Sequence, residues 1–203
     1  RFASISPNDG NVFCRCAGCR EIGGASDHTV FLANVVGRAV QREFPDRFVA
    51  FYAYDGHLRA PENRKLAPNV VPYIVNSHAR LGQGEWKYYA APIRSTAVGE
   101  VIKDWARLGS RTAIRFNWSG TKYPHNWVSH IRDDFRFYLE NKGVGAMAES
   151  TGNFVHVGWL NYWAGRVSWN VDLDIETEQA VLYRRFYGPG VGAATNVLAS
   201  VVN

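Results

Sequence analysis

The chain has 203 residues, of which 46% are hydrophobic and 20% are charged, and its net charge is +5. This composition is too apolar for intrinsic disorder and is typical of a globular protein with a large core. No apolar run approaches the roughly 20 residues that cross a bilayer, and no run of five basic residues occurs. We therefore expect neither a membrane span nor nucleic-acid binding.

Aromatic residues are unusually frequent, with seven Trp and ten Tyr. Packing inside the core is expected to account for Trp105, Trp159 and Trp163, which lie in helical patterns. The remaining excess favours a lined pocket, and flat apolar ligands such as sugar faces are one reason to have it.

The first 150 residues alternate between apolar runs typical of buried strands and amphipathic runs typical of helices. The predicted strands cover residues 2–6, 48–54, 70–75, 112–116 and 144–148. The predicted helices run from the capping residues Ser26 and Asp27 to Phe44, over 96–108 and over 126–142, and then, with no strand between them, over 157–169, 175–187 and 191–202. Pro72 interrupts the third strand and favours a bulge or an edge position there.

This alternation predicts an α/β fold with a parallel sheet covered by helices. Five strands are too few for a closed (β/α)8 barrel, so the sheet is either an open doubly wound one or the C-terminal portion of a TIM-like barrel. A strand at the first residues favours the barrel. We accordingly expect residues 1–150 to form that portion and residues 151–203 to form a helical tail packed on it. Because the chain starts at Arg1, next to a strand, we expect a longer protein with further domains.

Active sites in parallel α/β proteins lie at the carboxyl ends of the strands. Glycoside hydrolysis needs two carboxyl groups, one to donate a proton and one ionised. Glu149 ends an apolar strand, where burial would favour its protonated form, so we predict that it is the acid/base. Asp9 lies in a Pro-Asn-Asp-Gly loop rich in backbone donors, and we predict that it is the second carboxylate or binds a hydroxyl group.

Each carboxylate also has a simpler explanation. Asp9 could cap its turn, since Asn-Asp-Gly is ordinary turn chemistry, and Asp55 precedes a glycine in the same way. Glu149 could be paired with an arginine at the rim of the barrel. An acidic sugar would in turn need an arginine, and Arg59, Arg64, Arg80 and Arg94 all lie in loops at the correct ends.

Further residues at the strand ends suit sugar binding, which needs an aromatic platform and hydrogen bonds to hydroxyl groups. Trp118 is the first choice for the platform and Tyr54 the second, although core packing would explain a tryptophan equally well. The predicted substrate-binding residues are Trp118, Tyr54, Asp55, Asn76, His78 and Asn117.

Three cysteines lie within six residues, at Cys14, Cys16 and Cys19. With a fourth ligand such as His28 or His57 they would form a structural zinc site. A disulfide with one free thiol, or three reduced thiols, fits the spacing as well. No cofactor is required by the predicted chemistry, and no nucleotide-binding glycine motif is present.

Several segments together resemble one known family. They are Ser6-Pro7-Asn8-Asp9-Gly10, the Cys14–Cys19 run, Ser26-Asp27 with Phe31 and Asn34, Leu66-x-Pro68-Asn69-Val70-Val71, Asn117-Trp118, the strand from Gly143 to Ser150, Trp169-Asn170-Val171-Asp172 and Phe186-Tyr187-Gly188. In this order they resemble a large bacterial domain-of-unknown-function family that is distantly similar to α-glucuronidases and β-hexosaminidases.

The resemblance implies a TIM-like barrel with a carbohydrate-related role and a secreted or periplasmic location. It predicts a glycoside hydrolase acting on a glycan. The alternatives are a non-catalytic carbohydrate-binding barrel and a barrel that serves as a scaffold for partner domains. Since the family's domain is longer, this chain would begin near its middle strands.

Overall fold

The fold is a five-stranded parallel sheet with helices, and its strands follow the chain order β1-β2-β3-β4-β5. The computed structural model describes residues 2–7, 13–62, 64–76, 92–109, 111–117, 128–149 and 154–202. The strands are β1 (Phe2–Ser4), β2 (Phe48–Ala53), β3 (Val70–Asn76), β4 (Thr112–Asn117) and β5 (Gly143–Glu149). Each strand is parallel to its neighbours, and the sheet curls, which is consistent with part of a TIM-like barrel.

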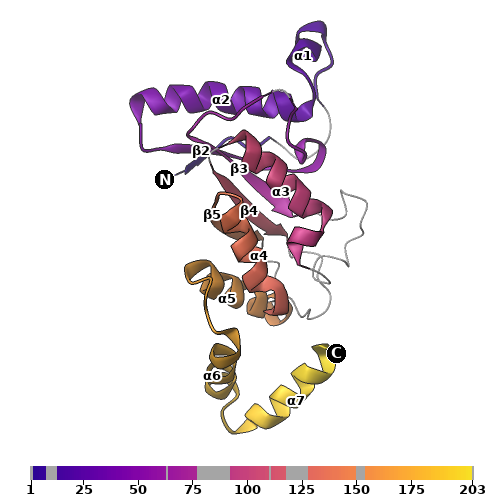
Figure 1. The fold of residues 1–203 in the computed structure, drawn as a ribbon, viewed down its shortest axis with the longest axis vertical. Helices are drawn as coiled ribbons and strands as arrows, with labels where there is room; N and C mark the ends of the chain where they lie inside the picture. The colour runs from indigo at the N-terminus through magenta and orange to yellow at the C-terminus, as the bar shows by residue number, and fades with distance from the viewer. Residues whose placement is uncertain are drawn as a thin grey trace.

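The helices lie in the connections and in the C-terminal region, as Figure 1 shows. They are α1 (Ala17–Ile22), α2 (Ala25–Glu43), α3 (Ala97–Leu108), α4 (Val128–Glu140), α5 (Phe154–Trp169), α6 (Ile175–Tyr187) and α7 (Val191–Val202), with short 3-10 turns η1 (Asp55–His57), η4 (Ile93–Ser95) and η5 (Gly188–Gly190). Among the described helices, none is long and apolar enough to cross a membrane.

Capping residues explain where several helices begin. Asp27 accepts the backbone N–H of Gly24 at 3.0 Å, so α2 starts slightly before the predicted position. Thr96 accepts the N–H of Gly99 at the start of α3, and Asp174 accepts that of Thr177 at the start of α6. In each case an oxygen satisfies an N–H group that has no partner inside the helix.

One face of the sheet is covered by α2, α3 and α4 and carries the core. Phe51 on β2 meets Trp105 of α3, with ring centroids 5.6 Å apart. Phe116 on β4 packs against Phe135 and Tyr138 of α4. The alternation of side chains along each strand therefore gives this face its large apolar residues.

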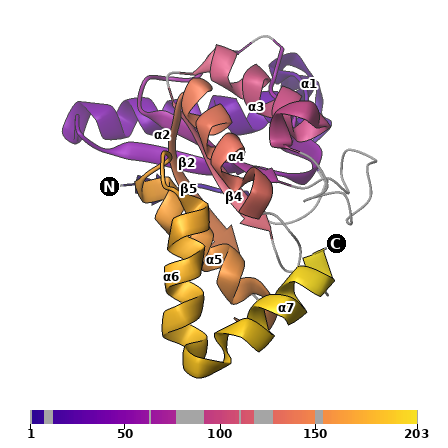
Figure 2. The same cartoon turned by 60° about the horizontal axis from the view of Figure 1, so that its bottom comes forward.

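The C-terminal helices extend the molecule away from the sheet. Helix α5 packs against α4 and β5, and Trp163 in it is fully buried. Trp159 lies against Tyr183 and Phe186 of α6. Figure 2 shows α6 and α7 joined at a sharp bend. The division into residues 1–150 and a packed tail remains a prediction.

Two predictions about the strands were wrong. Pro72 lies in β3, the central strand, not at an edge or bulge. The sheet tolerates it because the pairing of β3 with β4 begins only at Tyr73, so that ladder does not need an N–H from residue 72. Strand β5 was expected to be buried, but Val144 and Met147 are 47% and 40% exposed. Among the described strands, β5 has a neighbour on one side only, so its apolar run is covered on fewer sides.

Candidate functional site

The face of the sheet turned away from α2, α3 and α4, called the inner face here, carries a row of aromatic and charged side chains. Its members are Phe2, Phe48, Tyr52, Tyr73, Arg115, Met147 and Glu149. They come from all five strands. Side chains of paired residues on neighbouring strands point to the same face, as do alternate side chains along one strand. The row is therefore continuous across the sheet.

Contacts link the aromatic half of this row across β1, β2 and β3. Phe2 meets Tyr73 edge-on, with ring centroids 6.0 Å apart, and Tyr73 meets Tyr52 at 6.4 Å with the rings nearly perpendicular. Edge-to-face contact holds aromatic rings in fixed orientations. Burial and the neighbouring Tyr52 raise the pKa of Tyr73, so its hydroxyl stays protonated at neutral pH.

The charged half of the row lies at the carboxyl ends of β4 and β5. Arg115 donates to Oε2 of Glu149 at 2.6 Å, and its guanidinium carbon lies 4.9 Å from the centre of the Tyr52 ring. The Arg115 side chain is 19% exposed and that of Glu149 is 41% exposed. Tyr52 also reaches β5, since its hydroxyl is 3.6 Å from the sulfur of Met147. The tyrosine, the arginine and the glutamate therefore form one cluster.

Glu149 is paired with a cation. A carboxylate 2.6 Å from a guanidinium accepts a charge-assisted hydrogen bond, which is shorter and stronger than one between neutral groups. An ionised carboxylate is suited to act as a base, a nucleophile or a stabiliser of positive charge, and not as a proton donor. The desolvation expected from the apolar strand is limited, because the edge position of β5 leaves the side chain in contact with water.

A second cluster lies beyond β1, where the chain passes from Phe13 into α1. The sulfur atoms of Cys14, Cys16 and Cys19 all lie within 4.8 Å of one another. A hydrogen bond from the backbone of Cys19, followed by one from the Cys14 thiol, lowers the pKa of Cys16. Hydrogen bonds with Cys14 and Cys16 raise the pKa of the Cys19 thiol to about 11.

The thiol cluster borders an open hollow of about 330 Å³. The hollow is lined by Phe13, Cys14, Arg15, Cys19, Arg20, Gly23, Gly24, Ala25, His28 and Gly56. Because Gly56 belongs to η1, directly after β2, the hollow lies at the carboxyl-end side of the sheet. Its charged lining groups, Arg15 and Arg20, are both cationic.

Two histidines lie beside Phe13, whose ring contacts those of His28 and His57 edge-on. His28 lines the hollow, and its Nε2 is 2.7 Å from the carbonyl oxygen of Cys19. His57 is 2% exposed, and neither of its ring nitrogens has a hydrogen-bond partner among the described residues. Burial lowers the pKa of His57, and the backbone of Tyr52 and the charge of Asp55 only partly oppose this effect.

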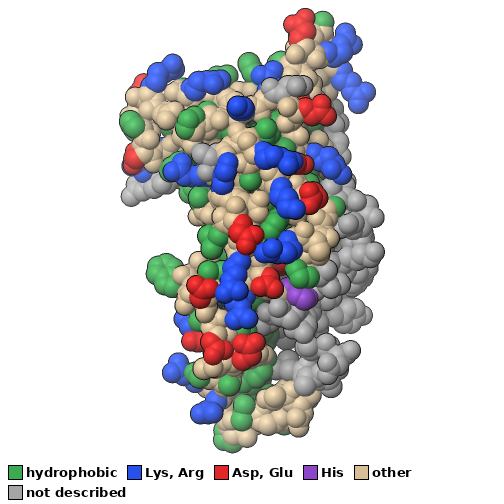
Figure 3. Space-filling model, in the orientation of Figure 1, with side chains coloured by type: hydrophobic (Ala, Val, Ile, Leu, Met, Phe, Trp, Pro, Cys, Tyr) green, Lys and Arg blue, Asp and Glu red, His purple; other side chains and the backbone are tan. Residues whose placement is uncertain are grey.

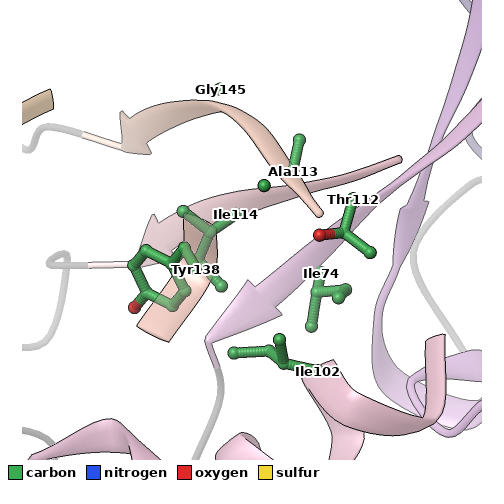
Figure 4. A pocket seen from close by; sticks show the side chains of 8 residues that line it. Ile74, Ile102, Thr112, Ala113, Ile114, Tyr138 and Gly145 are labelled. Atoms are coloured by element: carbon green, nitrogen blue, oxygen red, sulfur yellow. The ribbon is translucent and has the colours of Figure 1, made fainter. Parts of the chain in front are cut away.

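A third space, in the core, is too small for a ligand. Its volume is about 10 Å³, close to that of a single water molecule. Figure 4 shows Ile74, Ile102, Ile114 and Tyr138 grouped around it on the helix side of the strands. This cavity is a packing defect, and it includes none of the predicted site residues.

A comparison with protein-family models identifies the family. The model described as "Domain of unknown function (DUF4838)" matches residues 1–201. The chain belongs to the DUF4838 family. No curated protein and no solved structure matches it. The predicted resemblance to an uncharacterised family is therefore confirmed, while the likeness of DUF4838 to glycoside hydrolases stays a prediction.

The structure of this DUF4838 chain locates several of the predicted site residues. Glu149 lies in the inner-face cluster, and Asn117 ends β4 opposite it in the register. Tyr54 and Asp55 follow β2 at η1, where Asp55 has a positive φ of 51°. Asn76 ends β3 and is buried, and its Oδ1 lacks a partner among the described residues. Asp9, His78 and Trp118 lie outside the described residues, as does Arg80.

Three residues of the inner-face row were not predicted from the sequence, namely Arg115, Tyr52 and Tyr73. Each lies inside a strand, whereas the predicted site residues lie at or just after strand ends. A usable signal was present for Arg115, since it is the one charged residue in the otherwise apolar run from Thr112 to Phe116. A lone charge inside a buried strand needs a partner, and here that partner is Glu149.

Proposed function

We propose that this DUF4838 domain acts on glycans as a glycoside hydrolase by two-carboxylate chemistry, and that its curled sheet is part of a (β/α)8 barrel. The observation that carries the proposal is the Tyr52–Arg115–Glu149 cluster on the inner face. In a barrel of this kind the inner face at the carboxyl ends of the strands surrounds the active site.

The cluster suggests a division of roles. Glu149, which accepts a hydrogen bond from Arg115 at 2.6 Å, acts as the nucleophile or base. Asp9, which follows β1 in the sequence, then supplies the proton. This reverses the roles that the sequence favoured, because the arginine lies beside Glu149.

The neighbouring groups fit the recognition of a sugar. Tyr52 and Tyr73 offer apolar ring edges and faces, with Trp118 as a further platform. Arg115 supplies a guanidinium group on the inner face, and its side chain is 19% exposed. A uronic acid, whose carboxylate pairs well with a guanidinium, is the substrate class that this arrangement favours.

The test compares two glutamate-to-glutamine variants of the full chain. Glu149→Gln should lower kcat/KM on a panel of aryl glycosides, aryl glucuronides included, by about 10²–10⁴-fold. Glu140→Gln is the matched control, because Glu140 pairs with Arg94 at 3.5 Å on the helix side of the molecule. Equal turnover by wild type and Glu149→Gln would exclude Glu149 from the reaction.

A non-catalytic carbohydrate-binding barrel is the second candidate, since the aromatic row would serve it equally and the ion pair could be purely a binding feature. The same variants separate the two. A binding module should show saturable glycan binding by calorimetry with no turnover on any substrate, and Tyr52→Ala should weaken that binding. In a hydrolase, Glu149→Gln should lose turnover and keep its affinity for substrate.

A further inference from the structure

We propose that Cys14, Cys16 and Cys19 bind one zinc ion as three thiolate ligands, with the fourth coordination position facing the adjoining hollow. This inference does not depend on the proposed hydrolase activity, because the residues, the loop and the test are all separate from Glu149 and Arg115.

The first support is the geometry of the thiols. Their sulfur atoms lie within 4.8 Å of one another, without any disulfide among them. Sulfur ligands at about 2.3 Å from a tetrahedral zinc lie just under 4 Å apart. Small side-chain rotations would bring the three atoms to that spacing. The short separations in sequence, one and two intervening residues, keep the backbone positions fixed relative to one another.

The second support is the surroundings of the cluster. A zinc ion with three thiolates carries a net charge of −1, and Arg15 and Arg20 line the same hollow and offset it. Cys14 and Cys16 are exposed, so an ion can reach the cluster from solvent. Thiolates are soft ligands that select zinc over the hard cations magnesium and calcium.

The position of the two histidines decides the fourth ligand. His57 is buried beyond Phe13, and His28 has its Nε2 directed to the carbonyl of Cys19 at 2.7 Å. Neither histidine belongs to the group of ligand atoms within 4.8 Å. Among the residues that the structure describes, no other side chain joins the three thiols, and we assign the fourth position to solvent or to a ligand in the hollow. His28 instead supports the backbone of Cys19 from outside the coordination shell, which is how ligands are commonly held in place.

A bound zinc ion would affect the fold only near the connection that carries the cysteines. The three ligands lie on the connection between β1 and α2, on the same side of the sheet as the end of β2. A zinc ion there would fix a connection that otherwise has little apolar contact, since α1 contains no buried residue.

The experiment uses the full chain, purified under reductant without chelators and then dialysed against buffer that contains no metal. Elemental analysis should find one zinc per chain. Titration of the apo protein with cobalt should give the near-ultraviolet sulfur-to-cobalt charge-transfer bands of thiolate coordination. Alkylation of all three thiols should be slower in the presence of zinc, a result that needs no variant.

Variants identify the ligands. Cys14→Ser, Cys16→Ser and Cys19→Ser should each weaken zinc binding by at least about tenfold, while Arg38→Gln, at an exposed position of α2 that does not line the hollow, should keep one zinc per chain. Zinc retained by all three serine variants would overturn the assignment. A wild-type chain that holds no stoichiometric zinc, and whose thiols react equally fast with and without zinc, would also overturn the assignment. A chain isolated with a disulfide in place of the ion would overturn it too.

Discussion

The two faces of the sheet are built from the same strands but carry different chemistry. The helix-covered face holds Phe51, Ile74 and Phe116, all at most 1% exposed, and each meets apolar side chains from α3 or α4. The inner face carries Tyr52, Tyr73 and Arg115, which are partly exposed and make polar or edge contacts. Residues one position apart in a strand thus pack in the core on one side and present aromatic and polar groups on the other.

The two faces of the sheet should tolerate substitutions to different degrees. A residue packed between strand and helix is surrounded on all sides, so a smaller replacement leaves a cavity. A residue on the inner face borders solvent, which can fill the space that a smaller replacement leaves. We therefore expect substitutions on the helix-covered side to lower stability and those on the inner face to affect mainly binding or turnover.

The ion pairs on the two sides of the sheet differ in their exposure to solvent. Figure 3 shows Lys and Arg side chains interspersed with Asp and Glu over the face drawn there. On the helix side Arg94 pairs with Glu140 and Lys103 with Glu100, all of them well exposed. The Arg115–Glu149 pair differs, since its arginine is mostly buried and is stacked on a tyrosine. Exposed pairs contribute little to stability, so we expect neither pair on the helix side to contribute much to it.

The largest effect should come from Trp105→Ala. Trp105 is fully buried, packs on Phe51 and donates from its indole nitrogen to the carbonyl of Leu58 at 2.8 Å. The free energy of unfolding, measured by urea titration, should fall by about 3–5 kcal/mol. Trp169→Ala is the control, since Trp169 is 92% exposed and should change stability by less than about 0.5 kcal/mol. Similar losses in both variants would contradict the division into core and surface.

A smaller loss is expected for a polar residue on the helix-covered side, Asn34→Ala. Asn34 in α2 donates to the carbonyl of Lys65 at 2.9 Å and accepts the N–H of Ala67 at 2.8 Å, which fixes the segment leading into β3. Removing its amide leaves two backbone groups without partners, at a cost of about 2 kcal/mol. Urea titration against Asn170→Ala, a variant at an exposed turn, would measure it. A loss no greater than that of the control would show that water replaces both bonds.

The sequence predicted the helix-covered side better than the inner face, for a physical reason. Apolar periodicity located all five strands and gave the bounds of α6 and α7, because burial in helices and strands imposes periods of 3.6 and 2. Which partner a buried polar group finds depends on long-range register, which no local pattern encodes. Arg115 and Glu149 are separated by 34 residues, and only the β4–β5 pairing brings them together.

Edge effects were a second source of error. The run from Gly143 to Glu149 has the composition of a buried strand, yet its exposure follows from having a neighbour on one side only among the described strands. Pro72 was misplaced for the opposite reason, since proline itself is typical of an edge or a bulge, whereas the register gives it a central position. Composition describes a strand's own residues, whereas burial depends on what lies beside them.

His57 adds a pH-dependent test of the helix-covered side. Burial lowers its pKa in the folded state below the ordinary value of 6.5, so between these two values the unfolded chain binds a proton that the native protein does not. The free energy of unfolding should therefore rise with pH across that window and level off above it. Urea titrations between pH 5 and 8 would measure the slope. His57→Gln should remove that contribution and His130→Gln should retain it; an unchanged slope in His57→Gln would assign the effect to another group.

The smallest expected effect concerns the inner face itself. A double-mutant cycle with Arg115→Met and Glu149→Gln isolates the coupling of the pair, which we expect to be about 0.2–1 kcal/mol, because Glu149 is 41% exposed and water screens its charge. Urea titration of the four proteins gives this number directly. A coupling of several kcal/mol would make the pair a structural feature and break the contrast between the two faces. A small coupling, together with a large loss of turnover in Glu149→Gln, would mean that the ion pair contributes to chemistry far more than it contributes to folding.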